Sequence, residues 1–276
     1  MSKNMGIYKG IDELIDKYLD LKIGIDPGKS PLYIHKTSCT KLSHTPSQFS
    51  AEAFINALLT CIENNWNSSP RRISNLHPSK ENWRFEKKEY IDKRSNLSPE
   101  KTLEKAIISV VNMDWANQVP TASGLYDSTK DKHRSIDLVH RLETKCYEVI
   151  ELKIASDNPL KAAMEVLFYG VLYIFARLHP SLYHQNHDLL HADEILLSVL
   201  APCEYYKTYN LKWLESNLCS GLQRFLPTRM VNCKISFAFK AFPSWFKWSV
   251  DKSNETDMQR YLLTVIENVV PVLWSE

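Results

Sequence analysis

Residues 146–154 follow a pattern of apolar and polar positions that predicts a β-strand. The segment is rich in β-branched and aromatic residues, and most of it is apolar. Alternation along a strand puts Glu151 and Lys153 on one face and Ile150, Leu152 and Ile154 on the other. A buried charge is costly unless it is paired or bound to a metal. We therefore expect this carboxylate and this ammonium group to have a specific role.

A second predicted strand covers residues 134–142, and Asp137 interrupts its apolar centre. Residues 143–145, Glu-Thr-Lys, are typical of a turn between the two strands. The two segments together predict a hairpin, which would bring Asp137 beside the strand that carries Glu151. The register of this hairpin is not defined by the sequence.

The segment after the hairpin predicts a long, buried helix over residues 159–178. Ser156, Asp157 and Asn158 are capping residues, and a proline follows them at an early helical position. The helix is apolar on nearly every side, which is typical of a core helix. One polar stripe interrupts it, because residues spaced by four share a helix face. The stripe consists of Lys161, Glu165, Tyr169 and Tyr173.

The other elements predict a mixed α/β fold. Further helices are expected at 10–21, 50–66, 98–113, 211–225 and 256–273, and further strands at 32–35, 117–126, 194–201 and 230–242. Residues 37–48 are expected to form a loop. This order of elements indicates a mixed central sheet with helices on both faces. We expect a mostly helical N-terminal region over residues 1–95 and an α/β domain over residues 96–276, with the Pro-, Ser- and Asn-rich stretch 67–79 near their boundary.

The hairpin and the helix after it resemble the PD-(D/E)XK nuclease superfamily over residues 98–242. Asp137 stands at the Asp position, and Glu151 and Lys153 form the Glu-x-Lys. Ile136 occurs where the name of the superfamily has Pro. An exonuclease-like branch carries Gln-x-x-x-Tyr on the helix that follows, and in this chain Glu165 and Tyr169 have that spacing, with Glu in place of Gln.

This resemblance implies a restriction-endonuclease-like core with an N-terminal, mostly helical extension. It implies a divalent-metal-dependent nuclease that hydrolyses phosphodiester bonds in DNA, with Mg²⁺ or Mn²⁺ as cofactor. The implied metal ligands are the carboxylates of Glu104, Asp137 and Glu151 and the backbone carbonyl of Leu152. Glu100 competes with Glu104 for its place on the preceding helix. The implied catalytic residues are Asp137, Glu151, Lys153, Glu165 and Tyr169.

A structural role for the same residues is the alternative. Asp137 and Lys153 would then form a buried ion pair, although such pairs are not efficient stabilisers. Glu165 and Tyr169 would form the polar edge of a helix that meets solvent. The protein would be a nuclease-fold nucleic-acid-binding or assembly protein without catalytic activity.

The net charge of +2 does not by itself argue for a nucleic-acid partner. Residues 71–105, however, hold ten Lys and Arg against six Asp and Glu. This stretch is either a solvated charged surface or a phosphate-binding surface beside the site. Under the second interpretation the contacts come from Arg84, Lys87, Lys88, Lys93 and Arg94.

DNA is the expected partner, and RNA stays open as an alternative substrate. No signal peptide is evident at the start of the chain, and the six scattered cysteines are typical of reduced thiols, so we expect a cytoplasmic location. The uncharged run from Val166 to Ala176 is too short to span a bilayer, so we expect no membrane partner. A homodimer or a protein partner bound through the N-terminal region stays open.

Overall fold

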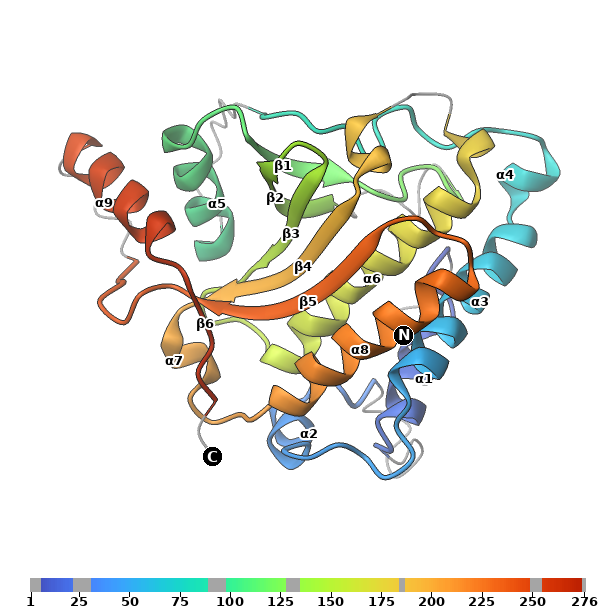
Figure 1. The fold of residues 1–276 in the computed structure, drawn as a ribbon, viewed down its shortest axis with the longest axis horizontal. Coiled ribbons are helices and arrows are strands. Elements are labelled where there is room, and N and C mark those ends of the chain that lie inside the picture. Colours follow the sequence, from blue (N-terminus) through green and yellow to red (C-terminus); the bar gives the residue numbers. More distant parts are fainter. Residues whose placement is uncertain are drawn as a thin grey trace.

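The computed structural model describes residues 6–21, 31–88, 98–127, 135–183, 187–248 and 255–274. Its centre is a six-stranded mixed sheet in the order β1-β2-β3-β4-β5-β6 (Figure 1). The strands are β1 (Trp115–Pro120), β2 (Ser135–Glu143), β3 (Cys146–Leu152), β4 (Glu194–Ala201), β5 (Lys234–Ala241) and β6 (Val270–Pro271). The predicted α/β class and the mixed sheet are confirmed.

The described helices surround this sheet. They are α1 (Ile11–Tyr18), α2 (Lys36–Lys41), α3 (Ala51–Asn67), α4 (Pro70–Ile73), α5 (Pro99–Val110), α6 (Pro159–Leu178), α7 (Cys203–Tyr206), α8 (Lys212–Thr228) and α9 (Glu255–Glu267). Two short 3₁₀ helices, Pro180–Leu182 and Asp188–His191, follow α6. Helices therefore alternate with strands from α5 onward.

The sheet changes direction at β3. Strands β1, β2 and β3 form an antiparallel meander, whereas β3, β4 and β5 run parallel and β6 is antiparallel to β5. In the β2–β3 hairpin, Val139 pairs with Val149 and Leu138 pairs with Ile150. A parallel step needs a long crossover connection, and α6 provides it between β3 and β4. The carboxyl ends of β3, β4 and β5 consequently lie at the same edge of the sheet.

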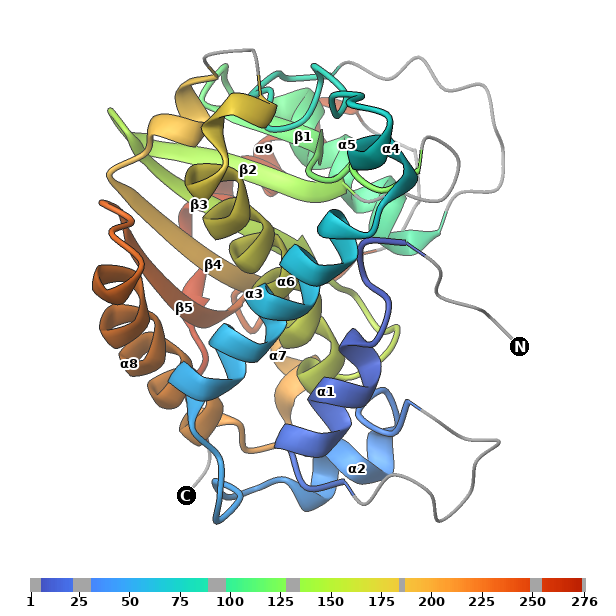
Figure 2. The same cartoon turned by 90° about the vertical axis from the view of Figure 1, so that its right-hand side faces the viewer.

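Helices cover both faces of the sheet. On the face we call the α6 face, α6 lies against the strands with α3 and α1 outside it, as Figure 2 shows, and Val149 belongs to this core. On the opposite face, α5 and α9 pack over Leu138, Ile150 and Leu152. The alternation predicted for β3 is confirmed, because Val149 and the pair Ile150 and Leu152 belong to different cores.

Two glycines permit the close packing of α6 and α8. A Cβ atom at Gly170 would lie 2.5 Å from Cδ1 of Leu197 on β4, and one at Gly221 would lie 2.5 Å from Cβ of Ala51 on α3. Helix α6 is long and apolar enough to cross a membrane by length and composition, but 83% of its most apolar window is buried inside the protein. It is the central core helix, as its apolar pattern predicts.

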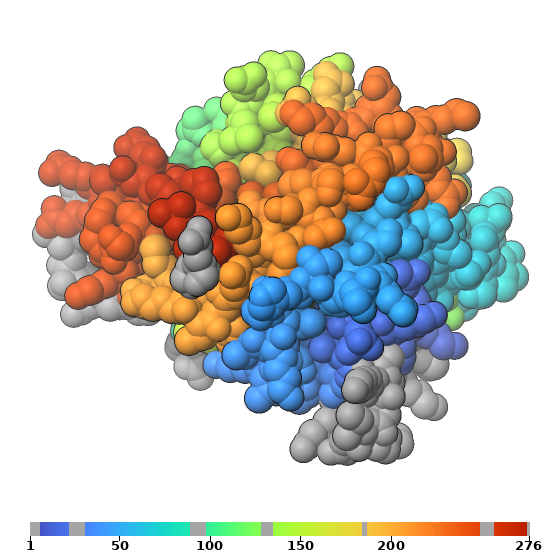
Figure 3. Space-filling model, turned by 60° about the horizontal axis from the view of Figure 1, so that its bottom comes forward, coloured from blue at the N-terminus to red at the C-terminus, as the bar shows by residue number. Residues whose placement is uncertain are grey.

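The N-terminal helices share one hydrophobic core with the sheet. Helix α3 packs on α6 and α8, and Figure 3 shows the N-terminal segments in contact with the surface of α8. The predicted boundary at residues 95 and 96 falls within residues 89–97, which lie outside the described part of the chain.

Some local predictions are wrong. Residues 32–35 form a turn rather than a strand, because the buried Asp16 carboxylate accepts hydrogen bonds from the N–H groups of Leu32 (2.7 Å) and Tyr33 (2.8 Å). Helix α2 occupies part of the predicted loop 37–48. The predicted last helix ends early at Glu267, and the chain then continues into the short strand β6.

Candidate active site

Asp137 and Glu151 face each other across the β2–β3 hairpin. The β2–β3 ladder runs as far as the pair of Leu138 with Ile150, and the next step of the same register brings Asp137 opposite Glu151. The ladder ends there, and the N–H of Leu152 donates to Oδ2 of Asp137 at 3.1 Å. Both carboxylates lie on the α6 face at the carboxyl end of β3, so the predicted proximity of the two residues is confirmed.

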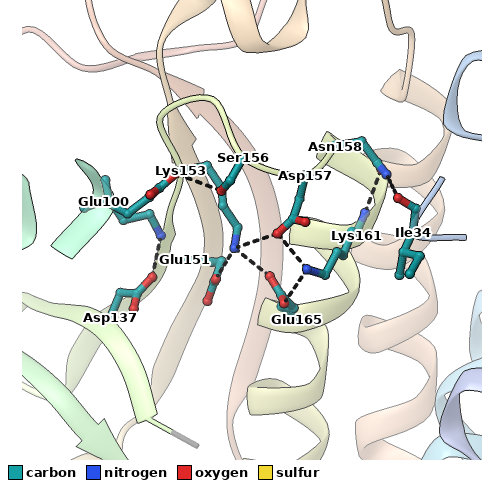
Figure 4. A network of polar contacts seen from close by, with 11 residues as sticks. Ile34, Glu100, Asp137, Glu151, Lys153, Ser156, Asp157, Asn158, Lys161 and Glu165 are labelled. Carbon is teal, nitrogen blue, oxygen red and sulfur yellow. Dashed lines mark hydrogen bonds and ion pairs between the residues drawn. The ribbon is translucent and has the colours of Figure 1, made fainter. Parts of the chain in front are cut away.

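Lys153 lies between two carboxylates. Its Nζ is 2.8 Å from Oε1 of Glu151 and 2.7 Å from Oε2 of Glu165 on α6, as Figure 4 shows. Its backbone N–H donates to the carbonyl of Leu200 on β4 at 2.9 Å, which fixes the chain just after β3. The predicted position of Glu165, on the same side of the sheet as Lys153, is confirmed.

The first turn of α6 extends this contact network toward solvent. Lys161 Nζ lies 2.6 Å from Oδ2 of Asp157 and 3.6 Å from Oε1 of Glu165, and Asp157 lies 3.8 Å from Nζ of Lys153. Exposure of the side chains rises outward, from 7% for Glu151 and 10% for Lys153 to 29% for Glu165. We call Asp137, Glu151, Lys153, Asp157, Lys161 and Glu165 the carboxylate–lysine cluster; it is buried at its inner end and open at its outer end.

Asn158 fixes the start of α6. Its side-chain oxygen accepts the N–H of Lys161 at 3.0 Å, and its Nδ2 donates to the carbonyl of Ile34 at 2.7 Å (Figure 4). The residue is fully buried. The N-terminal region is therefore tied directly to the helix that carries Glu165.

The cluster contains four carboxylates and two ammonium groups. The pKa values of its two inner carboxylates, Asp137 and Glu151, are both raised. Burial, and then the charge of Glu104, raises the pKa of Asp137 to about 6 against the lowering effect of the Leu152 N–H. Burial and the charge of Asp137 raise the pKa of Glu151 well above its usual value. Burial lowers the pKa of Lys153, but the charges of Glu151 and Glu165 outweigh it, so this pKa is raised and the ammonium group stays charged.

Tyr169 lies at the inner margin of the cluster. Its hydroxyl donates to the carbonyl of Ser135, at the start of β2, at 3.0 Å. Burial, and then the charges of Glu151 and Asp137, raise its pKa well above the usual value. The last residue of the predicted stripe, Tyr173, belongs instead to the core, where its hydroxyl accepts a hydrogen bond from Arg177 at 2.9 Å.

Glu104 is buried beside the cluster, but both of its oxygens have partners. Oε1 accepts from Asn117 at 3.1 Å, and Oε2 accepts from Gln118 at 2.8 Å and lies 3.3 Å from Nζ of Lys101. Its charge nevertheless contributes to the raised pKa of Asp137.

The competing residue on the same helix, Glu100, has a different role. Its Oε1 accepts the hydroxyl of Ser156 at 2.7 Å, which ties α5 to the loop after β3. Burial raises the pKa of Glu100, but the Ser156 hydroxyl and nearby backbone hydrogen bonds outweigh this effect and lower it.

The inner carboxylates have features that suit a divalent cation. Within the described residues, no group of three or more His, Cys, Asp or Glu side chains is arranged to hold a metal ion. Mg²⁺, however, is usually held by one or two carboxylates together with waters and substrate phosphates. Oε2 of Glu151 is buried and has no hydrogen-bond partner in the described part of the chain, and a cation beside Asp137 and Glu151 would relieve their repulsion. The two carboxylates therefore fit such an ion, and the Leu152 carbonyl as a further ligand stays a prediction.

The basic stretch is held largely by contacts within the chain. Arg84 forms ion pairs with Glu81 and Glu86, both at 3.2 Å. Nζ of Lys87 donates to the carbonyl of Val111 at 2.6 Å, and Nζ of Lys88 donates to that of Gln118 at 2.7 Å. Lys93 and Arg94 lie outside the described residues.

Sequence reasoning missed the part of Asp157 in the cluster. The signal was present, since Asp157 and Lys161 have the i,i+4 spacing of a helical ion pair. Asp157 also has a left-handed backbone, with φ of 63°, which turns the chain from β3 into α6. The link from Asn158 to Ile34 spans 124 residues and leaves no local pattern in the sequence.

No family model matches the chain, and no match was found among curated proteins or solved structures.

Proposed function

We propose that this protein is a divalent-metal-dependent nuclease of the PD-(D/E)XK type that hydrolyses phosphodiester bonds in DNA. The order of elements supports this proposal, because α5, β1, β2, β3, α6 and β4 would form the restriction-endonuclease-like core. In this core the helix with Glu104 precedes the meander, and the helix with Glu165 follows the strand of Glu151 and Lys153.

One observation carries the proposal. Asp137, Glu151 and Lys153 meet at one end of the hairpin and on one face of the sheet, with Nζ of Lys153 2.8 Å from Glu151. A buried and a half-buried carboxylate at facing strand positions, Glu151 and Asp137, destabilise a fold that has no ligand for them. Such an arrangement is more typical of a binding or catalytic site than of a structural one.

The residues of the chain have distinct roles in this proposal. A Mg²⁺ or Mn²⁺ ion held by Asp137, Glu151 and the Leu152 carbonyl would activate water and neutralise phosphate oxygens. The charged Lys153 would stabilise negative charge that develops on the phosphate, and its raised pKa argues against a role as general base. Glu165 would hold this ammonium group in place through the 2.7 Å contact.

Glu104 and Tyr169 would act at the margin of the site. Glu104 would orient Asn117 and Gln118, since its own oxygens already accept hydrogen bonds from these residues. Its charge would also raise the pKa of Asp137. Tyr169 would position the start of β2 through the Ser135 carbonyl. Arg84, Lys87 and Lys88 would contribute mainly to the local structure, and a phosphate-binding role for Lys93 and Arg94 stays a prediction.

A cleavage assay with a matched ion pair tests the proposal. Glu148, on the same strand as Glu151, is buried and forms its own ion pair with the half-buried Lys240 at 2.8 Å. We expect Mg²⁺-dependent cleavage of duplex or single-stranded DNA by the wild type, with a loss of about 100-fold or more in Lys153→Met. Lys240→Met should lower stability and keep cleavage. An RNA substrate in the same assay tests the alternative nucleic acid, and absence of cleavage of every substrate would refute the proposal.

The low exposure of Glu151 and Lys153 favours one alternative function. Their side chains are only 7% and 10% exposed. Such low exposure is also typical of an ion pair whose role is purely structural. The protein would then be a nuclease-fold nucleic-acid-binding or assembly protein. In that case Lys153→Met and Lys240→Met should both reduce stability, and neither should change nucleic-acid binding.

A further inference from the structure

Helix α7 begins at the strand end that carries the carboxylate–lysine cluster. Strand β4 runs parallel to β3, and the N–H of Lys153 donates to the carbonyl of Leu200 near the end of β4. Helix α7 starts two residues after β4, and the N–H of Tyr205 donates to the carbonyl of Pro202 at 2.9 Å. Tyr205 belongs to the core of the α6 face, the face on which Glu151 and Lys153 lie.

The hydroxyl of Tyr205 is buried and has no hydrogen-bond partner among the described residues. The side chain as a whole is 8% exposed. The adjacent Tyr206 differs, because its hydroxyl lies 3.0 Å from the carbonyl oxygens of both Val199 and Lys240. A buried hydroxyl without a partner lowers stability, and a phenylalanine would fill the same space without that cost. A ligand that accepts a hydrogen bond from this hydroxyl would explain the tyrosine.

The place of Tyr205 in the fold indicates where such a ligand would lie, because α7 follows β4 at the sheet edge and on the sheet face that carry the cluster. Burial, and then the charges of Asp157, Glu165, Cys39 and Glu151, raise its pKa, so the hydroxyl remains a proton donor at neutral pH. Three of these four neighbours belong to the cluster. Among the described residues, Oε2 of Glu151 is also buried without a hydrogen-bond partner. An unpaired donor and an unpaired acceptor therefore occur on the same face of the sheet, at the carboxyl ends of β3 and β4.

We propose that Tyr205 is a further substrate-binding residue of this site, whose hydroxyl donates a hydrogen bond to a phosphate oxygen of the bound nucleic acid. The proposal rests on the proposed nuclease function. The cluster's own carboxylates leave the hydroxyl unpaired, so it is available to an incoming acceptor. The ammonium groups of Lys153 and Lys161 offset two of the four carboxylates, and the divalent cation proposed at Asp137 and Glu151 would offset the other two.

Tyr205→Phe, compared with Tyr206→Phe, tests this assignment. The probe is thymidine 5′-monophosphate in the presence of Mg²⁺, with its dissociation constant measured by calorimetry. Loss of one hydrogen bond to a charged phosphate should weaken binding about tenfold in Tyr205→Phe, and DNA cleavage should fall by a similar factor. The melting temperature of Tyr205→Phe should equal or exceed that of the wild type, whereas Tyr206→Phe should melt at a lower temperature.

The outcomes separate this inference from the proposed function. Weaker mononucleotide binding in Tyr205→Phe supports the inference even if the wild type cleaves no nucleic acid, a result that would refute the nuclease proposal alone. Equal binding in the two proteins, or no binding to the wild type, would overturn it. A drop in melting temperature as large as that of Tyr206→Phe would also overturn it, because the hydroxyl would then have a structural partner.

Discussion

Asp137 and Glu151 lie opposite each other where the β2–β3 ladder ends, and burial together with the charge of Asp137 raises the pKa of Glu151. The pKa of Asp137 is itself raised to about 6. Both groups therefore bind protons more tightly in the folded protein than in the unfolded chain. The pair opposes folding when both carboxylates are charged, and this has consequences for pH and for cation binding.

The first prediction concerns stability and pH. The pKa of Asp137 is about 6 in the folded protein, against an ordinary value of 3.8 for this side chain. The free energy of unfolding should therefore fall as pH rises between these two values. Asp137→Asn removes this titration, and its amide oxygen can still accept the Leu152 N–H. We expect the variant to be more stable than the wild type at pH 7, by on the order of 2 kcal/mol, and equal to it near pH 4.

Urea unfolding at a series of pH values measures this effect. Mg²⁺ or Mn²⁺ at pH 7 should stabilise the wild type and not Asp137→Asn, and calorimetry should show proton release on binding. Equal cation affinities in the two proteins would remove the metal site from the proposal.

The second prediction concerns two Glu–Lys pairs on opposite faces of the sheet, Glu151 with Lys153 and Glu148 with Lys240. Lys153→Met leaves Glu151 without its ammonium partner and leaves Glu165 only the 3.6 Å contact with Lys161, and we expect a loss on the order of 3 kcal/mol in unfolding free energy. The additional change Glu151→Gln should recover much of this loss, because it removes the buried charge. A double-mutant cycle from denaturant unfolding measures the coupling.

The pair Glu148 and Lys240 gives the comparison for this cycle. Ser198 donates to Oε1 of Glu148 at 2.6 Å, so the Glu148 carboxylate keeps a partner when Lys240 is replaced. Lys240→Met should therefore lower stability less than Lys153→Met does. A larger loss of unfolding free energy in Lys240→Met than in Lys153→Met would contradict this prediction. It would show that the Glu151 carboxylate keeps other stabilising partners when Lys153 is replaced.

The hairpin and the buried helix were predictable because they depend on local alternation. Asp137 interrupts one apolar strand, Glu151 and Lys153 share a face of the next, and α6 is apolar on nearly every side. The contact of Lys153 with Glu165 follows from the short connection between β3 and α6. The pattern of residues in each segment was sufficient for these features.

The contacts that the N-terminal region makes, within itself and with α6, were not predictable in the same way. They depend on residues far apart in the sequence, such as Asp16 with Leu32 and Asn158 with Ile34. The strand predicted at 32–35 is wrong for this reason, since a tertiary hydrogen bond to a buried carboxylate overrides the local β preference. The partners of Lys87 and Lys88 are backbone carbonyls, which have no signature in the sequence.

The third prediction concerns Glu165. Glu165→Gln keeps an oxygen that can accept from Lys153 and restores the amide of the exonuclease-like branch, so most of the cleavage activity should remain. Glu165→Ala removes the 2.7 Å contact and should lower kcat by at least about tenfold, with a smaller change in KM. Steady-state cleavage kinetics measure both constants. Equal activity in the two variants would reduce Glu165 to the polar edge of a helix.

The fourth prediction separates two parts of the basic stretch. Lys87→Ala and Lys88→Ala each remove a side-chain hydrogen bond to a backbone carbonyl, so the melting temperature should fall while the salt dependence of DNA binding stays constant. Replacing Lys93 and Arg94 together by alanine should reduce the slope of log affinity against log salt by about two. Binding measured across a salt series gives both slopes, and an unchanged slope in the second variant would make this stretch an ordinary charged surface.

The last prediction concerns the link between the N-terminal region and the cluster. Asn158 caps α6 and also binds the carbonyl of Ile34, and two substitutions separate these functions. Asn158→Ser keeps a capping oxygen but has no amide to donate to Ile34. Asn158→Ala removes both contacts and should cost about 1 kcal/mol more than the serine variant, the usual value of a helix cap.

Ser98→Ala is the control for capping alone, because Ser98 accepts the N–H of Lys101 at the start of α5 and is exposed. If the Ile34 link positions the first turn of α6, Asn158→Ser should lower cleavage several-fold at temperatures well below its melting point, whereas Ser98→Ala should lower only stability. The turn at residues 32–35 lies beside the first turn of α6, because Nδ2 of Asn158 donates to the Ile34 carbonyl at 2.7 Å. Cleavage by Asn158→Ser at the wild-type rate would show that the N-terminal region stabilises α6 without influencing the site.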